Sequence, residues 1–186
     1  MPGKMEFHST PITDVLVITP DIKSDARGFF LESFRQEEYR AMGIPGPFVQ
    51  DNQSGSKQGV LRGLHYQILR PQGKLVRVIT GEVFDVVVDL RKSSPTFGKW
   101  IGEYLSAKNA RQVWIPSGCA HGIYVRSPWA DLLYKVTDYY SPEGDRTLRW
   151  DDPTLDIRWP LVDGAPPIMS EKDNQGKLLS EAELFE

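Results

Sequence analysis

The stretch GVLRGLHYQ, residues 59–67, carries the pattern on which the expected fold and chemistry depend. Apolar residues and glycines set off one arginine and one histidine in it. Regular strand alternation places Leu61, Gly63 and His65 on one face and Arg62 on the other. Because Gly63 has no side chain, another backbone or a ligand can come close to His65. The stretch therefore predicts a strand whose histidine is open to close approach.

Strand-like runs of this kind recur along the chain. They are short, and turns that contain Gly, Pro or Asn separate most of them. Residues 23–25 are an expected turn, and Thr80-Gly81-Glu82, between two valine-rich runs, predicts a tight hairpin. The expected strands cover residues 15–19, 27–34, 48–54, 60–67, 74–80, 82–90, 99–105, 112–115, 122–125 and 131–138.

Helical patterns are scarce in the sequence. Residues 36–42 carry one, which ends at the Gly- and Pro-rich residues 43–47, and residues 177–185 predict a short terminal helix. After Asp138, prolines and tryptophans replace the strand pattern, so this tail is expected to pack on the strands. Many short strands with almost no helix between them indicate an all-β fold, an antiparallel sandwich or barrel. No repeat or linker interrupts the chain, so residues 1–186 predict a single domain.

Composition narrows the class of partner. The 25 acidic and 22 basic residues give a net charge of −3, which argues against a nucleic-acid surface but allows a local basic pocket for an anionic small molecule. A single cysteine, Cys119, excludes an intrachain disulfide, and the N-terminus has no apolar core of signal-peptide length. The longest apolar run, residues 83–90, is too short to cross a bilayer. We expect a cytoplasmic protein with no membrane association.

The histidines give the first indication of a site. The run PSGCAHG, residues 116–122, resembles the second motif of the cupin superfamily, Pro-x-Gly-x-x-His, and ends with His121 and a glycine. Cupins are jelly-roll barrels, which agrees with the strand pattern. Metal-binding cupins also carry His-x-His, because a divalent metal needs three or four converging ligands. Here the corresponding residues read His65-Tyr66-Gln67, and only Glu82 and Asp85 offer nearby carboxylates. We therefore expect no metal.

Proton transfer is the other chemistry open to a barrel histidine. Histidine changes charge nearest neutral pH, and a carboxylate partner can orient it. Lys74 and Arg62 are cations close in sequence to His65, and Tyr134 offers a phenol in an apolar stretch. A structural role for Tyr134, with its hydroxyl satisfied in the core, is the alternative. His8, near the N-terminus, is expected to be solvated.

A longer series of segments resembles the dTDP-4-dehydrorhamnose 3,5-epimerase family. The resemblance runs in order through nearly the whole chain, at residues 25–30, 48–52, 60–67, 72–77, 81–89, 94–98, 116–122, 133–135, 139–140, 150–153 and 170–173. It implies a cupin-type jelly roll and a cofactor-free isomerase of dTDP-L-rhamnose biosynthesis. The implied substrate is dTDP-4-dehydro-6-deoxy-D-glucose, inverted at carbons 3 and 5 to dTDP-4-dehydro-L-rhamnose.

The resemblance also implies roles for individual residues. His65 would remove the proton next to the 4-keto group with Asp173 as its carboxylate partner, Tyr134 would return a proton from the other face, and Lys74 would stabilise the enolate. The ring of Phe29 or Tyr140 would stack on the thymine. The remaining implied contacts to the nucleotide sugar are Arg27, Glu32, Gln50, Asn52, Arg62, His121, Asp145 and Lys172. Related proteins are homodimers, so strand pairing or exchange between subunits is expected.

Three alternatives stay open at this level. Related epimerases of antibiotic-sugar pathways invert carbon 3 or carbon 5 alone. A metal-dependent cupin oxygenase would bind its metal at His65 and His121, and a carbohydrate-binding jelly roll would have no catalytic activity.

Overall fold

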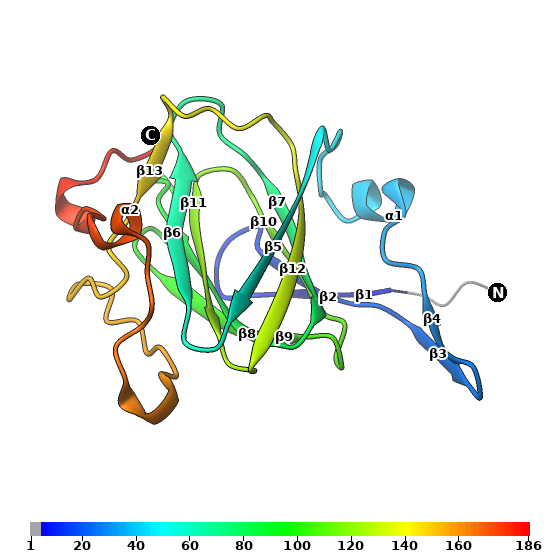
Figure 1. Ribbon diagram of the computed structural model, residues 1–186. Helices are drawn as coiled ribbons and strands as arrows, with labels where there is room; N and C mark the ends of the chain where they lie inside the picture. The colour runs from blue at the N-terminus through cyan, green and yellow to red at the C-terminus, as the bar shows by residue number, and fades with distance from the viewer. Residues whose placement is uncertain (1–4) are drawn as a thin grey trace.

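Two antiparallel sheets face each other in the structure, a computed structural model that describes residues 5–186 (Figure 1). The strand order is β1-β2-β10-β7-β12-β5 in the larger sheet and β13-β6-β11-β8-β9 in the smaller one. Strands close in sequence alternate between the sheets, as in a jelly roll. The expected all-β, cupin-type jelly roll is confirmed, and the first four residues of the expected domain lie outside the described part.

The elements have the following bounds. The six-stranded sheet contains β1 (Glu6–Ser9), β2 (Leu16–Thr19), β10 (Gln112–Ile115), β7 (Lys74–Thr80), β12 (Trp129–Val136) and β5 (Gln50–Lys57). The five-stranded sheet contains β13 (Asp145–Thr147), β6 (Leu61–Gln67), β11 (Cys119–Val125), β8 (Glu82–Asp89) and β9 (Trp100–Ser106). Outside these sheets lie β3 (Ile22–Asp25), β4 (Gly28–Leu31), α1 (Gln36–Ala41), α2 (Glu171–Asn174) and two 3-10 turns, Val162–Gly164 and Leu179–Glu181.

Apolar side chains from both sheets fill the interior. Val17, Val76 and Val113 of the larger sheet meet Val87 and Ile123 of the smaller one in one buried cluster. The outer face of the smaller sheet is covered by the tail, as expected, and the outer face of the larger sheet is covered in part by α1. The helix expected at 36–42 is confirmed. Among residues 5–186, no helix has the length and apolar character needed to span a membrane.

A β-bulge interrupts the alternation of β6. His65 pairs with His121 and Arg62 pairs with Ile123, so two residues of β6 lie opposite Gly122 alone. Because of this extra residue, Arg62 and His65 lie on the same, inner side of the sheet. The alternation expected from the sequence, with these two side chains on opposite faces, is therefore wrong.

The other face of β6 confirms this arrangement. Leu61, Leu64 and Tyr66 are buried in the cluster that the tail covers. Gly63 has a φ of +130°, and a Cβ placed on it would lie 2.6 Å from the Cα of Gly122. The group that approaches Gly63 is thus the backbone of the neighbouring strand. This contact makes glycine necessary at the bulge.

Two expected turns differ in the structure. Thr80-Gly81-Glu82 is not a hairpin, because β7 and β8 belong to different sheets and the turn carries the chain from one sheet to the other. A Cβ on Gly81 would lie 2.0 Å from the carbonyl oxygen of Trp129, so the packing of this crossover requires glycine. The expected turn at 23–25 is part of β3. The chain turns at residues 26–27 instead, which splits the expected strand 27–34 into a hairpin with β4 and an irregular segment.

The expected terminal helix at 177–185 is wrong except for the 3-10 turn Leu179–Glu181. Lys177 forms a bridge with Leu148, and Phe185 forms one with Arg91. The backbone groups of this segment bond to neighbouring chain segments, and Leu179, Leu184 and Phe185 each pack against the smaller sheet. These contacts favour an extended backbone over a helix.

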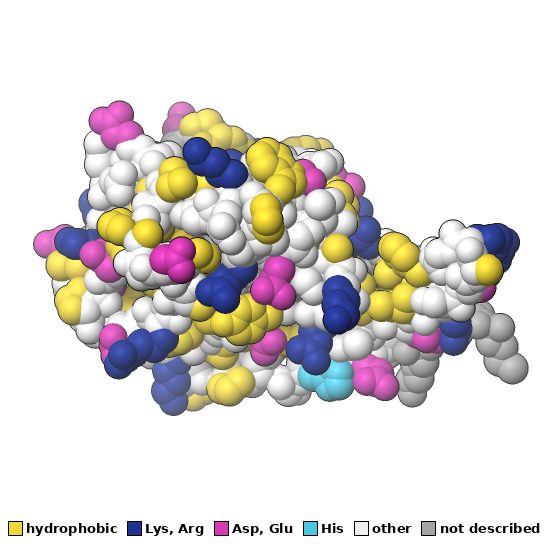
Figure 2. Space-filling model, turned by 60° about the horizontal axis from the view of Figure 1, so that its bottom comes forward, with side chains coloured by type: hydrophobic (Ala, Val, Ile, Leu, Met, Phe, Trp, Pro, Cys, Tyr) yellow, Lys and Arg dark blue, Asp and Glu magenta, His cyan; other side chains and the backbone are white. Residues whose placement is uncertain are grey.

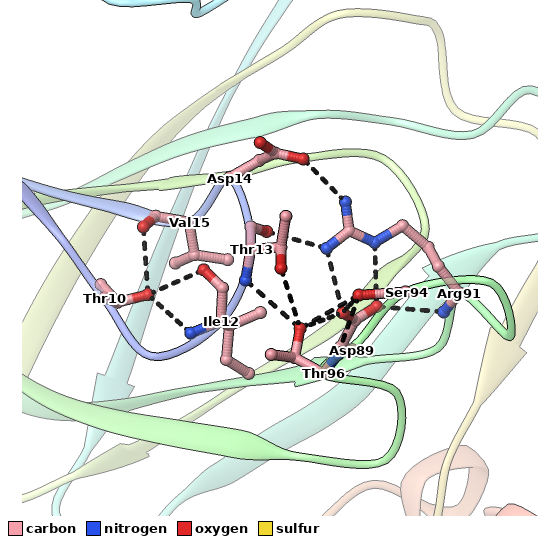
Figure 3. Close-up of polar contacts among 9 residues, drawn as sticks. All are labelled: Thr10, Ile12, Thr13, Asp14, Val15, Asp89, Arg91, Ser94 and Thr96. Carbon is pink, nitrogen blue, oxygen red and sulfur yellow. Dashed lines mark hydrogen bonds and ion pairs between the residues drawn. The ribbon is translucent and has the colours of Figure 1, made fainter.

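A buried carboxylate joins the two sheets (Figure 3). Asp89, at the end of β8, accepts hydrogen bonds of 2.6 to 3.0 Å from Arg91, Ser94 and Thr96. Arg91 also donates 2.8 Å to the carbonyl of Thr13, in the loop that precedes β2. Burial opposes the ionisation of Asp89, but the hydrogen bonds, led by that of Arg91, lower its pKa. The charged network therefore anchors a loop of the larger sheet to a loop of the smaller one.

Candidate active site

A cavity of about 340 Å³ opens between the two sheets. Its lining comes from β5, β6, β7, β12 and β13, from the loops before β7 and β13, and from α2. The lining residues are Gln50, Asn52, His65, Tyr66, Gln67, Gln72, Lys74, Tyr134, Tyr140, Asp145 and Lys172. Eight of these are among the residues expected from the sequence.

His65 and Asp173 form a hydrogen-bonded pair at this cavity. The Nε2 of His65 lies 2.5 Å from an oxygen of Asp173, which is buried on α2. Ser170 caps this helix and accepts a 3.1 Å hydrogen bond from the backbone N–H of Asp173. Burial opposes the ionisation of Asp173, but His65, together with the backbone N–H of Gly63, lowers its pKa. An ionised Asp173 therefore accepts the Nε2 hydrogen, which leaves Nδ1 of His65 free to accept a proton.

Lys74 enters the cavity from the larger sheet. Its Nζ donates 3.3 Å to the carbonyl of His65, and the side chain is buried. Burial lowers the pKa of Lys74 to about 8, although the charges of Asp145 and Asp85 oppose this shift. At neutral pH the group is still mainly an ammonium ion. Because it is held in a site of low dielectric, its charge interacts strongly with a nearby anion.

Tyr134 enters from β12 and packs against the apolar interior. Burial raises the pKa of Tyr134, and the charge of Arg62 opposes this rise. Arg62 itself donates 2.9 Å to the hydroxyl of Ser56 on β5. The phenol of Tyr134 thus carries its proton at neutral pH. After that proton leaves, the positive charge of Arg62 stabilises the phenolate. His65 and Tyr134 therefore reach the cavity from opposing sheets.

Asp145 organises the rim of the cavity. It accepts a 2.8 Å hydrogen bond from the hydroxyl of Tyr140 and forms an ion pair with Lys172. The hydrogen bond to Asp145 raises the pKa of Tyr140. Gln50 and Asn52 complete this side of the cavity, and the Nε2 of Gln50 donates 2.8 Å to Asn52. The rim thus combines one aromatic ring, one cation and several amides.

His121 lies beside His65, on the neighbouring strand β11, but has a different partner. Its Nε2 is 2.7 Å from Asp85, and both side chains are buried. The two imidazoles are each engaged by a separate carboxylate. Within residues 5–186, no three His, Cys, Asp or Glu side chains are placed to hold one metal ion. The metal-free site stays a prediction.

Five expected contacts do not line the cavity. Arg62 and His121 lie on β6 and β11, close to His65, and the other three lie in a separate segment. Arg27 and Phe29 are on the β3–β4 hairpin, which projects from the body of the molecule in Figure 1 and forms the knob at the right of Figure 2. Phe29 and Phe30 are 70% and 73% exposed, and Arg27 pairs with Asp25 of the same hairpin. Glu32 follows the hairpin and pairs with Arg35 at 2.6 Å. The chain does not bring these residues to its own cavity.

Four residues of the site were not expected from the sequence. Tyr66, Gln67 and Gln72 line the cavity, and Ser170 caps the helix that carries Asp173. A signal for Ser170 is present, because serine followed by an acidic residue three positions later is typical of a helix start. The roles of the two glutamines depend on a loop that is remote in sequence and have no local signal.

Known proteins resemble this chain along most of its length. A model of the dTDP-4-dehydrorhamnose 3,5-epimerase family matches residues 9–181. The chain is 57% identical over 182 residues to dTDP-4-dehydrorhamnose 3,5-epimerase of Pseudomonas aeruginosa, which covers 97% of this chain and 99% of that protein. A crystal structure of dTDP-6-deoxy-D-glucose-3,5-epimerase from Legionella pneumophila, in complex with dTDP-4-keto-L-rhamnose, superposes with a TM-score of 0.93 and 52% identity, over 97% and 95% of the two chains.

A more distant structure represents the related enzymes that act on one carbon. A 3'-monoepimerase from Streptomyces bikiniensis, in complex with dTDP-quinovose, has a TM-score of 0.87 and 33% identity, over 93% of this chain and 87% of that chain. The resemblance stated from the sequence is confirmed by the family model and by the relatives that share half or more of their residues with it. The chain therefore belongs to the dTDP-4-dehydrorhamnose 3,5-epimerase family of enzymes.

Proposed function

We propose that this enzyme converts dTDP-4-dehydro-6-deoxy-D-glucose to dTDP-4-dehydro-L-rhamnose by proton transfer, without a metal or an organic cofactor. The observation that carries the proposal is that His65, paired with Asp173, and a protonated Tyr134 reach one cavity from opposing sheets, and that the buried Lys74 lines the same cavity. Inversion at carbon requires an acid and a base on opposite sides of the sugar ring. The enzyme would act in the cytoplasm, where a lone buried thiol such as Cys119 is ordinary.

His65 is the base in this scheme. Its Nδ1 takes the proton from carbon 3 or carbon 5, and the bonding electrons move to the 4-keto oxygen to form an enolate. Lys74 faces this new charge, which is absent from the substrate, so its contribution is greatest in the transition state. Tyr134 then donates its phenolic proton to the opposite face of the carbon. Both carbons flank one ketone, so a single site serves both inversions.

After each inversion, two groups must return to their starting protonation states. His65 has gained a proton and Tyr134 has lost one, so both must exchange protons with water before the second inversion. Arg62 stabilises the transient phenolate, consistent with its effect on the pKa of Tyr134. The new C–H hydrogens therefore come from solvent at both carbons.

Solvent exchange tests this function. In D₂O we expect one deuterium at carbon 3 and one at carbon 5 of the product, read by proton NMR, with the same rate after treatment with a chelator. Deuterium at one carbon only would identify a monoepimerase, and no turnover would indicate a sugar-binding protein. The 57% identity to a 3,5-epimerase, against 33% to a 3'-monoepimerase, favours double labelling.

We also propose that the enzyme is a homodimer in which each hairpin completes the pocket of the partner subunit. The hairpin exposes two phenylalanines and carries Arg27 outside its own cavity, whereas the family resemblance assigns Arg27, Phe29 and Glu32 to the nucleotide. Lys172 lines the cavity and offers a cation for the diphosphate, and an arginine from the partner would add a paired donor. The tail supplies Asp173 and Lys172 to the barrel, so residues 1–186 act as one domain.

Mixing two variants tests the exchange between subunits. The Arg27→Ala and His65→Ala proteins should each have low activity as homodimers. After they are mixed under conditions that allow subunit exchange, about one quarter of wild-type activity should return, because half of the dimers are mixed and each mixed dimer has one intact site. Sedimentation checks the dimeric mass of each sample. If the hairpin served its own subunit, mixing would restore nothing.

A further inference from the structure

Gln67 occupies the place where metal-binding cupins carry the second imidazole of His-x-His, yet it has a different set of partners. Its Nε2 donates 2.7 Å to the carbonyl of Arg70 and 3.3 Å to the carbonyl of Tyr139. Its Oε1 accepts a 2.9 Å hydrogen bond from the backbone N–H of Ser141. Both donors of the amide and one acceptor site are therefore in use, which leaves little capacity for a direct contact with substrate.

The loop that Gln67 holds is the one that carries Tyr140. Residues 138–141 are part of the connection between β12 and β13, at the rim of the cavity. Glutamine side chains form a hydrogen bond with a backbone group of each of these four residues. Gln72 donates 2.8 Å to the carbonyl of Asp138, and Gln50 accepts a 3.2 Å hydrogen bond from the N–H of Tyr140. Gln67 holds the two remaining residues. It is 5% exposed, whereas Tyr140 is 53% exposed.

An exposed aromatic ring keeps a single orientation only if neighbouring groups hold it. The backbone N–H of Tyr140 donates a hydrogen bond to Gln50, and its hydroxyl donates one of 2.8 Å to Asp145. The other two glutamines hold the residues on either side of it. A ring held at both ends loses less conformational freedom when a planar base stacks on it, so binding becomes stronger. Such support acts on nucleotide binding and has no part in proton transfer.

We propose that Gln67 is a positioning residue that fixes loop 138–141 and so presents the Tyr140 ring to the nucleotide base. The inference rests on the proposed function and takes Tyr140, one of the two rings that the family resemblance implies, as the ring that stacks on the thymine. Gln67 acts through the loop and does not touch the substrate. It therefore contributes to affinity for the nucleotide and leaves the chemical step unchanged.

Gln67→Ala tests this role through a split between KM and kcat. We expect KM for the dTDP-sugar and Kd for dTDP to rise about 10-fold, with kcat within about 3-fold of wild type, because only uniform binding is lost. Gln58→Ala is the matched control, since Gln58 also donates 2.7 Å to a backbone carbonyl, that of Arg126, but does not line the cavity. It should leave KM unchanged. Gln67→Met keeps the side-chain length and replaces Gln67→Ala if that variant does not fold. A fall in kcat with unchanged KM would overturn the proposal.

A double-mutant cycle separates positioning from direct contact. In the Tyr140→Ala background, Gln67→Ala should raise KM less than about 2-fold, since the ring it positions is gone. An equal effect in both backgrounds would show that Gln67 acts independently of Tyr140 and would overturn the inference alone. An unchanged KM in Tyr140→Ala itself would remove the proposed stacking role, and the positioning inference with it.

Discussion

His65→Ala is expected to abolish the incorporation of solvent deuterium at both carbon 3 and carbon 5, with turnover at least about 10³-fold below wild type. Proton removal from carbon begins both inversions, and His65 is the imidazole that lines the cavity. The neighbouring imidazole of His121 is bound to Asp85 at 2.7 Å and is not part of the lining. Without His65, Asp173 has no group through which to act on the substrate.

The measurement is position-resolved proton NMR of the recovered sugar nucleotide in D₂O. His8→Ala is the matched control, because His8 lies on β1 near the surface, where its side chain pairs with Glu6. It should exchange as wild type does. Binding of dTDP to His65→Ala, expected within about 3-fold of wild type, shows that the pocket is intact. Exchange at either carbon in a folded His65→Ala protein would exclude His65 as the base for that carbon.

Tyr134→Phe should separate exchange from inversion. We expect inversion to fall about 10² to 10³-fold, while exchange at the substrate carbons falls less than about 10-fold. His65 and Lys74 still form the enolate in this variant. With no acid on the opposite face, the enolate regains a proton from the His65 side, so the original configuration returns with a deuterium label.

The ratio of label in recovered substrate to product formed measures this separation. Phenylalanine keeps the ring of Tyr134 packed against the apolar interior, so the fold should be maintained. Tyr104→Phe serves as control, because Tyr104 lies on β9 outside the cavity and should change neither rate. An equal loss of exchange and inversion in Tyr134→Phe would contradict its assignment as the acid.

Much of the fold follows from local patterns. Short apolar runs and frequent turns predict the all-β jelly roll. The Gly- and Pro-rich residues 43–47 predict the end of α1, which the structure has at Ala41, two residues before this segment. The wrong expectations concern pairing between distant segments. Thr80-Gly81-Glu82 has the composition of a hairpin, but the flanking strands pair with β11 and β12 in different sheets. The terminal segment has helix-forming residues, but contacts with the smaller sheet keep most of it extended.

For the site, too, the sequence indicates the residue types, and contacts between distant segments decide the arrangement. The resemblance indicates the chemical groups, and the structure brings eight of the fourteen expected residues to one cavity lining. Gln67 and Gln72 gain their importance from loop 138–141, which is about seventy positions away in sequence. Arg27, Phe29 and Glu32 remain outside the cavity because the hairpin that precedes α1 extends away from the barrel.

The sequence by itself determined the fold class, because strand patterns depend on residue type and on short-range alternation. Its resemblance to a known family indicated the family and the candidate acid, base and cation. The tertiary structure decided which groups meet. His65 and Asp173 are 108 positions apart and pair because the tail forms a bridge from Ile168 to Val60, just before β6, and so places α2 beside this strand. Arg62 and His65 share the inner face because a close contact between Gly63 and Gly122 forces a bulge, and a register of that kind is set by the neighbouring strand.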